Sequence, residues 1–252
     1  MRIAALSDIH GNLAALDAVL ADIAGHDIDL TVNLGDIVSG PLQPAETLDR
    51  LIPLDFPTIR GNQERQLLTM PLEKLGASDA YALPRLSPAH LHWLEELPAT
   101  MRIIGDVLLC HGTPDSDLLY FLDHVDANGA RAATAEEIEQ RTGAETARLI
   151  LCGHTHMPHT YRRPTGALIV NPGSVGLPAY DDVHPHPHVM ESGSAHARYA
   201  IATRGSDGNW AAELVMVPYD WESAARTAEA RGRPDWAIAL RTGRVSGPGR
   251  ST

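Results

Sequence analysis

The chain has 252 residues, of which 44% are hydrophobic, and it carries a formal net charge of −12 at pH 7. This size and composition are typical of one globular domain with a sizeable core, and no apolar run is long enough to cross a bilayer. The acidic balance argues against general binding to nucleic-acid backbones or anionic membranes. Residues 2–6 enter a strand pattern without a signal peptide, and two cysteines are too few for a disulfide framework, so we expect a cytoplasmic protein.

The N-terminal quarter predicts strands alternating with helices. Apolar runs predict strands at residues 2–6, 30–34 and 57–60. Helical spacing predicts helices at 13–24, capped by Asn12, and at 44–52, opened by Pro44. Such βα units place the carboxyl ends of their strands at one edge of a sheet.

The rest of the chain adds antiparallel strands and further helices. A hairpin at 101–110 follows a helix at 88–97, and the later elements are a helix at 134–141, strands at 149–152, 167–170, 198–203 and 211–217, and helices at 221–230 and 234–240. Parallel units followed by antiparallel strands predict an α/β fold with mixed sheets covered by helices. We expect a single domain over residues 1–245 and a disordered tail at 246–252.

Polar residues cluster where the predicted strands end. The five segments that carry them are Ser7–Asn12, Gly35-Asp36, Gly61–Glu64, Cys110–Gly112 and Cys152–His156. Imidazole, carboxylate and amide ligands suit divalent manganese, iron, zinc or nickel. Two such ions roughly 3.5–4 Å apart activate water and hold phosphate oxygens, so hydrolysis of a phosphate ester or anhydride is the leading hypothesis. Cys110 and Cys152 are read as buried strand residues.

The order of these motifs resembles the calcineurin-like metallophosphoesterase superfamily, in particular its small bacterial and archaeal phosphodiesterases. The resemblance rests on Asp8-x-His10, Gly35-Asp36, Gly61-Asn62-x-Glu64, His111, Gly153-His154-x-His156 and the segment from Val170 to Gly176. It implies two packed mixed sheets flanked by helices, an α/β/β/α sandwich. It also implies two divalent ions, with manganese as our first choice, and hydrolysis by a metal-activated water.

The resemblance assigns the metal ligands residue by residue. One ion would be held by Asp8, His10 and His156, the other by Asn62, His111 and His154, with Asp36 as the bridge. The proposed catalytic residues are Asp36, Asn62, Gln63 and His111. A non-catalytic scaffold of the same fold is the competing class, although here all seven ligand positions are filled.

One position departs from the family pattern. Many members have a histidine after the asparagine of the third motif, where it helps the leaving group to depart, but this chain has Gln63. Glutamine donates a hydrogen bond but cannot deliver a proton. We therefore expect small nucleotide-like substrates with good leaving groups, such as dinucleoside polyphosphates or aryl phosphodiesters. Cyclic nucleotides remain open, and phosphomonoesters or phosphoproteins are the alternative.

Three further features have simpler interpretations. Ser174 lacks a nucleophile-elbow pattern and is read as a turn residue. Arg60 is either directed at a substrate phosphate or a surface residue. His184-Pro185-His186-Pro187-His188 is expected to be a loop, because alternating prolines keep these histidines off a common face. The segment 181–194 around it could lie near the site and limit substrate shape.

Overall fold

A computed structural model describes residues 1–245; the tail expected at 246–252 lies outside them. The first sheet has the order β13-β12-β1-β2 and is formed by β1 (Arg2–Leu6), β2 (Leu30–Asn33), β12 (Ala197–Arg204) and β13 (Trp210–Val217). β1 and β2 are parallel, with Ala5 opposite Val32, while β12 is antiparallel to both of its neighbours. This sheet is mixed, as predicted.

The second sheet is also mixed and has the order β3-β4-β7-β9-β8. Its strands are β3 (Thr100–Ile103), β4 (Val107–Cys110), β7 (Leu149–Leu151), β8 (Pro158–Arg162) and β9 (Leu168–Pro172). β4, β7 and β9 run parallel, and β3 and β8 are antiparallel edge strands. The residues of the parallel strands are all buried, and apart from Asn171 they are apolar, as expected for a sheet covered on both faces.

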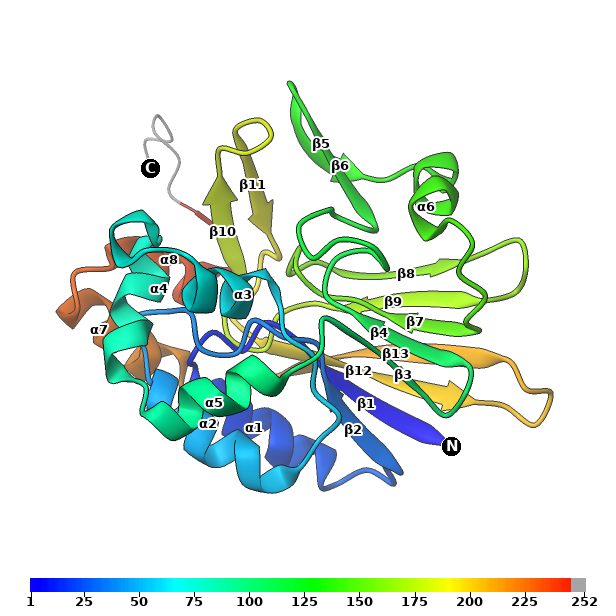
Figure 1. Cartoon of the computed structure of the whole chain (residues 1–252), viewed down its shortest axis with the longest axis horizontal. Coiled ribbons are helices and arrows are strands. Elements are labelled where there is room, and N and C mark those ends of the chain that lie inside the picture. The colour runs from blue at the N-terminus through cyan, green and yellow to red at the C-terminus, as the bar shows by residue number, and fades with distance from the viewer. Residues whose placement is uncertain (246–252) are drawn as a thin grey trace.

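The two sheets pack face to face and helices cover their outer faces (Figure 1). The first sheet packs on α1 (Leu13–Ile23), α2 (Pro44–Leu51), α3 (Asn62–Thr69), α4 (Ala77–Ala82) and α5 (Pro88–Glu96). α6 (Ala135–Thr142) covers the second sheet, where Cys110 and Cys152 are buried as predicted. The predicted α/β/β/α sandwich is confirmed.

The C-terminal helices belong to an apolar cluster outside the sandwich core. α7 (Trp221–Ala230) and α8 (Pro234–Thr242) form a separate apolar cluster with Leu42, Leu177 and Ala179. Ala179 belongs to β10 (Ala179–Asp182), which pairs with β11 (His188–Glu191) in a hairpin. α8 therefore lies against the base of this hairpin.

The structure lacks one predicted strand and contains several elements that the sequence patterns did not predict. The strand expected at 57–60 is reduced to one parallel bridge between Asn33 and Thr58, because Pro57 has no N–H and Arg60 donates instead to Pro98. The β10–β11 hairpin and a second hairpin, β5 (Asp123–Asp126) with β6 (Gly129–Ala132), were not predicted, and neither were β8, α3 and α4. Both hairpins project beyond the sheets (Figure 1). None of the helices within residues 1–245 is long and apolar enough to span a membrane.

Candidate metal centre

The polar strand-end residues converge where β1, β2, β4 and β7 end. Seven residues other than glycine have a positive φ within residues 1–245, and five of them belong to this group: Asp8, His10, Asp36, His154 and His156. A left-handed conformation costs a non-glycine residue of order 1–3 kcal/mol and tends to persist at functional sites. The backbone strain therefore coincides with the predicted metal ligands.

Glycines let the strand-end loops touch. A Cβ on Gly61 would collide with the carboxylate of Asp36, and a Cβ on Gly153 would collide with the hydroxyl of Ser7. Each clash would separate two loops that carry predicted ligands. At these two positions glycine is needed for the approach of one loop to another.

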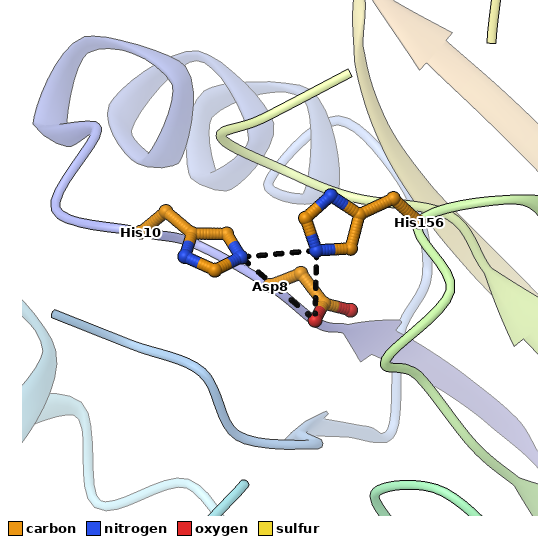
Figure 2. Close-up of side chains that lie close together, drawn as sticks. All are labelled: Asp8, His10 and His156. Atoms are coloured by element: carbon orange, nitrogen blue, oxygen red, sulfur yellow. Dashed lines mark hydrogen bonds and ion pairs between the residues drawn. The ribbon is translucent and has the colours of Figure 1, made fainter. Parts of the chain in front are cut away.

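The first group of predicted ligands consists of Asp8, His10 and His156, and all three are buried (Figure 2). Nε2 of His10 lies 3.0 Å from Nε2 of His156. Oδ1 of Asp8 lies 3.4 Å from the His156 nitrogen and 4.0 Å from that of His10. Ligand atoms about 2.0–2.2 Å from a shared ion lie roughly 3–4 Å apart, so these three atoms fit one ion.

The second group consists of Asp36, His111 and His154. Nε2 of His111 lies 3.3 Å from Oδ2 of Asp36 and 3.1 Å from Oδ1 of Asn62, which is the first residue of α3. The two groups are adjacent, because the backbone N–H of His154 donates to Oδ2 of Asp8 at 3.2 Å. The structure thus brings together all seven residues predicted as ligands.

Hydrogen bonds to backbone carbonyls fix how the imidazole rings are oriented. Nδ1 of His10 donates to Ser39 at 2.8 Å, and Nδ1 of His156 donates to Leu177 at 2.7 Å. Their Nε2 atoms then carry lone pairs when the rings are neutral, and two lone pairs 3.0 Å apart repel each other unless a cation lies between them. Oδ1 of Asp8 is buried and accepts no hydrogen bond from the described residues. These donors fit a divalent cation.

The second group shows the same arrangement. Nδ1 of His111 donates to Leu34 at 2.7 Å, which directs Nε2 towards Asp36 and Asn62. His154 uses Nε2 for the carbonyl of Leu118 at 3.1 Å, so its Nδ1 is the atom left for a ligand. Histidines that bind metals commonly donate their other nitrogen to a carbonyl in this way.

Burial and neighbouring charges shift the pKa values of the histidines in both groups. Burial, reinforced by the neighbouring imidazole His156, lowers the pKa of His10 to about 4, and burial with His111 lowers that of His154 to about 4. Burial opposes the charge on His111, but Asp36 raises its pKa to about 10. His10 and His154 are therefore neutral at pH 7, the form that binds a cation, whereas a metal ion would have to displace a proton from His111.

The two groups open into a cavity of about 260 Å³. Its walls include His10, Asp36, Asn62, His154 and His156, together with Gln63, Ser78, Tyr120, Leu177, Tyr180, Asp181, Asp182, Arg233, Asp235, Trp236 and Val245. Gln63 thus faces the site, and its side-chain oxygen accepts no hydrogen bond from residues 1–245. Arg60 is not part of the lining and donates to the carbonyl of Leu97 at 3.4 Å, which favours the structural interpretation of that residue.

Comparison with known proteins identifies the family. Residues 1–191 match the family model of the calcineurin-like phosphoesterase superfamily domain. The chain belongs to this superfamily. An uncharacterized protein of Methanocaldococcus jannaschii is 27% identical over 259 residues, which is 93% of this chain and 94% of the relative.

Solved structures support the assignment to the calcineurin-like phosphoesterase superfamily. A metallophosphoesterase from Sphaerobacter thermophilus superposes with a TM-score of 0.73 at 26% identity, covering 97% of this chain and 99% of its own. A candidate diadenosine tetraphosphatase has the same fold, with a TM-score of 0.53 at 18% identity over 86% of this chain and 94% of its own. Membership of this superfamily supports the assignment as a metal-dependent hydrolase, and the two groups are its candidate sites for divalent ions.

Some residues of this phosphoesterase support the ligands without belonging to them. Glu64 is fully buried and accepts the backbone N–H groups of Asp36, Ile37 and Gly61 at 2.7–2.9 Å. Burial, then the charge of Asp36, raises the pKa of Glu64 to about 7. Glu64 belongs to the motif Gly61-Asn62-x-Glu64, which does not reveal its role; in the structure it holds the loop that carries Asp36.

The end of β9 and the segment that follows it have a similar supporting role. Ser174 donates to the carbonyl of Asp8 at 2.7 Å and accepts the N–H of Leu177 at 2.8 Å, so its interpretation as a turn residue is confirmed. Asn171 donates to the carbonyl of Gly153 at 2.7 Å. These contacts tie the Asp8 loop and the His154 loop to the second sheet.

Two tyrosines of the cavity wall were missed because no motif marks them. The Tyr120 and Tyr180 hydroxyls lie 2.6 Å apart, and the Tyr120 hydroxyl lies 2.9 Å from Nε2 of His188. Nδ1 of His188 donates to the carbonyl of His186, so Nε2 accepts from Tyr120, which in turn accepts from Tyr180. This chain of hydrogen bonds fastens the β10–β11 hairpin beside the site. The expected loop is confirmed for residues 183–187, while His188 begins β11.

Proposed function

We propose that this phosphoesterase hydrolyses phosphodiester or phosphoanhydride bonds in nucleotide-like substrates and uses two divalent ions, with manganese as the first choice. The observation that carries the proposal is the pair of adjacent ligand groups that open into one cavity. When bound, the ions would polarise phosphate oxygens and lower the pKa of a water molecule.

The proposed roles follow from the contacts. Asp8, His10 and His156 would hold one ion, and Asn62, His111 and His154 the other, with Asp36 shared. Oδ1 of Asp36 already accepts the backbone N–H of Gln63 at 3.0 Å. The proposed bridging carboxylate is thus linked directly to Gln63, the residue proposed to face the leaving group. Gln63 can stabilise a leaving oxygen with a hydrogen bond but supplies no proton.

The substrate preference rests on Gln63 and on the size of the cavity. Without a proton donor at that position, leaving groups that are stable as anions are favoured. The cavity is smaller than the roughly 300–1,000 Å³ of pockets that enclose whole drug-sized ligands, so it would take the phosphate and adjoining atoms only. Dinucleoside polyphosphates and aryl phosphodiesters satisfy both conditions. We expect the protein to act on these small substrates in the cytoplasm.

A substrate screen tests the proposal. The manganese-loaded protein would be assayed with diadenosine polyphosphates, cyclic nucleotides, aryl phosphodiesters and alkyl phosphomonoesters. We expect the highest kcat/KM for the first class or the third. Turnover of alkyl phosphomonoesters alone, or no turnover of any class at full metal loading, would contradict the proposal.

A further inference from the structure

One wall of the cavity comes from a part of the chain beyond the superfamily match, which ends at residue 191. Arg233, Asp235 and Trp236, at the beginning of α8, line the cavity together with the predicted metal ligands. Arg233 is the only lysine or arginine among the cavity-lining residues that the structure describes. Within residues 1–245 it is therefore the one guanidinium or ammonium group on the cavity wall that could face a bound anion.

Several contacts hold Arg233 in place. Its Nε and Nη2 donate to Asp235 at 3.0 and 2.6 Å, and Nη1 donates to the hydroxyl of Ser78 at 3.0 Å. The guanidinium lies 5.6 Å from the centre of the Trp236 ring, and this ring lies 6.0 Å from the imidazole of His10. Arg233 and the predicted ligand His10 thus both lie close to the Trp236 ring.

The guanidinium retains capacity for a further ligand. Of its five N–H donors, three are used by Asp235 and Ser78, which leaves two, one on each terminal nitrogen. Its side chain is 22% exposed. Paired donors of this kind match the oxygens of a phosphate group.

We propose that Arg233 binds a second phosphate group of the substrate, one that is not hydrolysed. The inference rests on the proposed function and narrows its substrate class to nucleotides with at least two phosphates. With one phosphate at the ligand groups, the next phosphates of the chain extend past Trp236 to Arg233. An aryl phosphodiester has no group to place there.

The acidic residues of the wall limit what else the substrate can carry. Asp235 is 54% exposed and competes with a phosphate for Arg233. Asp181 and Asp182 on β10 add negative charge, and Oδ1 of Asp182 already accepts the N–H groups of Val183 and His184. Free carboxylate oxygens accept hydrogen bonds from hydroxyl or amino groups, which a nucleoside provides.

Steady-state kinetics of Arg233→Gln tests the inference. Diadenosine tetraphosphate and bis(p-nitrophenyl) phosphate would be compared in the manganese-loaded wild type and variant. A hydrogen bond to a charged group is worth about 10–100-fold, so we expect the ratio of kcat/KM for the two substrates to fall by at least about 10-fold. Arg241→Gln, a control on the same helix outside the cavity lining, should keep the wild-type ratio. An unchanged ratio in Arg233→Gln would overturn the inference.

A second variant keeps the test independent of folding and of catalysis. Asp235→Asn, a change at an exposed residue, weakens the ion pair that competes with a phosphate for Arg233. The variant should therefore bind the β,γ-methylene analogue of diadenosine tetraphosphate several-fold more tightly than the wild type does. Calorimetry would measure both affinities, each expressed relative to the affinity for AMP. Equal affinities in both proteins would count against Arg233 as a phosphate ligand. Absence of hydrolysis by the wild type, with this binding difference intact, would refute the proposed function and leave the binding site standing.

Discussion

A single substitution of Asp36 is expected to weaken metal binding at both ligand groups. Its carboxylate is buried, lies 3.3 Å from His111 and accepts the N–H of Gln63. Asp36→Asn keeps the size of the side chain but removes the charge, and a neutral amide is a poor bridge between two cations. We expect nearly complete loss of turnover and reduced metal content, with an unchanged circular dichroism spectrum.

A control for Asp36→Asn is available elsewhere in the chain. Asp55 also has a positive φ but is exposed and outside both groups, so Asp55→Asn should retain activity and metal. Wild-type turnover of Asp36→Asn at full metal content would show that the dinuclear assignment is wrong.

Gln63 supports a prediction about selectivity. An alkoxide leaving group needs a proton in the transition state, and a general acid contributes typically 10²–10⁴-fold, whereas a leaving group of low pKa needs none. The wild-type rate should therefore fall steeply as leaving-group pKa rises, and Gln63→His should flatten this dependence. The measurement is log kcat/KM against leaving-group pKa for a series of phosphate esters.

Gln66→His, on the same helix but outside the cavity lining, is the matched control for Gln63→His. It should reproduce the wild-type slope. Parallel slopes for wild type and Gln63→His, with two metals bound in each, would remove the basis for the preference for good leaving groups.

Glu64 gives a prediction about stability. In Glu64→Gln the amide NH₂ must face at least one of the backbone N–H groups that the carboxylate now accepts. A buried donor without an acceptor costs about 1–3 kcal/mol. We expect the free energy of unfolding of the metal-free protein to fall by this amount in urea titrations. Glu95→Gln, an exposed change on α5, should have little effect, and equal stability of the two variants would contradict the role given to Glu64.

The convergence of the candidate ligands could be predicted from sequence, while most of the cavity wall could not. Asp8, His10, Asp36 and His111 each follow a recognisable strand, and such strands deliver their ends to one edge. Tyr120, Tyr180 and Trp236 come from a loop, a hairpin and a C-terminal helix, where an aromatic residue indicates packing as readily as a site. Only the tertiary structure brings them to the ligands.

Among the elements, the β10–β11 hairpin has the most direct bearing on substrate choice. Its strand residues Asp181 and Asp182 line the cavity, so the expectation that segment 181–194 lies near the site is confirmed for them. His188 is buried and accepts from Tyr120, which makes β11 part of the supporting structure. The side chains of the tip, residues 183–187, take no part in the cavity lining or in the bond between Tyr120 and His188.

Replacing residues 183–187 with a short Gly-Ser turn tests whether the hairpin limits substrate shape. We expect a changed ratio of kcat/KM between bulky and small phosphodiesters, with unaltered metal content, because the tip directly follows Asp181 and Asp182, which line the cavity. The same replacement in the β12–β13 turn, residues 205–209, is the control. Identical ratios in both variants would make the tip a passive surface loop.

The errors in the predicted elements have physical causes. The run at 57–60 has the apolar character of a strand, but Pro57 cannot donate and the backbone turns away after one bridge. The β10–β11 hairpin is stabilised by contacts with Tyr120 and α8 rather than by a strong local pattern. Local sequence therefore identified the long apolar strands and missed short elements that depend on distant partners.

At the scale of the whole molecule, the two sheets bring ligands from four strand ends to one place. Each group combines loops from both sheets: Asp8 and His10 follow β1 while His156 follows β7, and Asp36 follows β2 while His111 follows β4. The sandwich core must therefore be intact for either ion to bind. The buried, unpaired oxygen of Asp8 and the facing nitrogens of His10 and His156 are stable arrangements only with a cation or proton between them.

The number of divalent ions per chain, measured together with turnover, tests this account most directly. Metal-free protein would be titrated with manganese, bound metal counted by inductively coupled plasma mass spectrometry after desalting, and hydrolysis of bis(p-nitrophenyl) phosphate followed at each step. The account predicts binding that saturates at about two ions per chain, with turnover rising as the second ion binds. Full turnover at one ion per chain or fewer, or two bound ions in a triple variant lacking Asp8, Asp36 and His111, would contradict it.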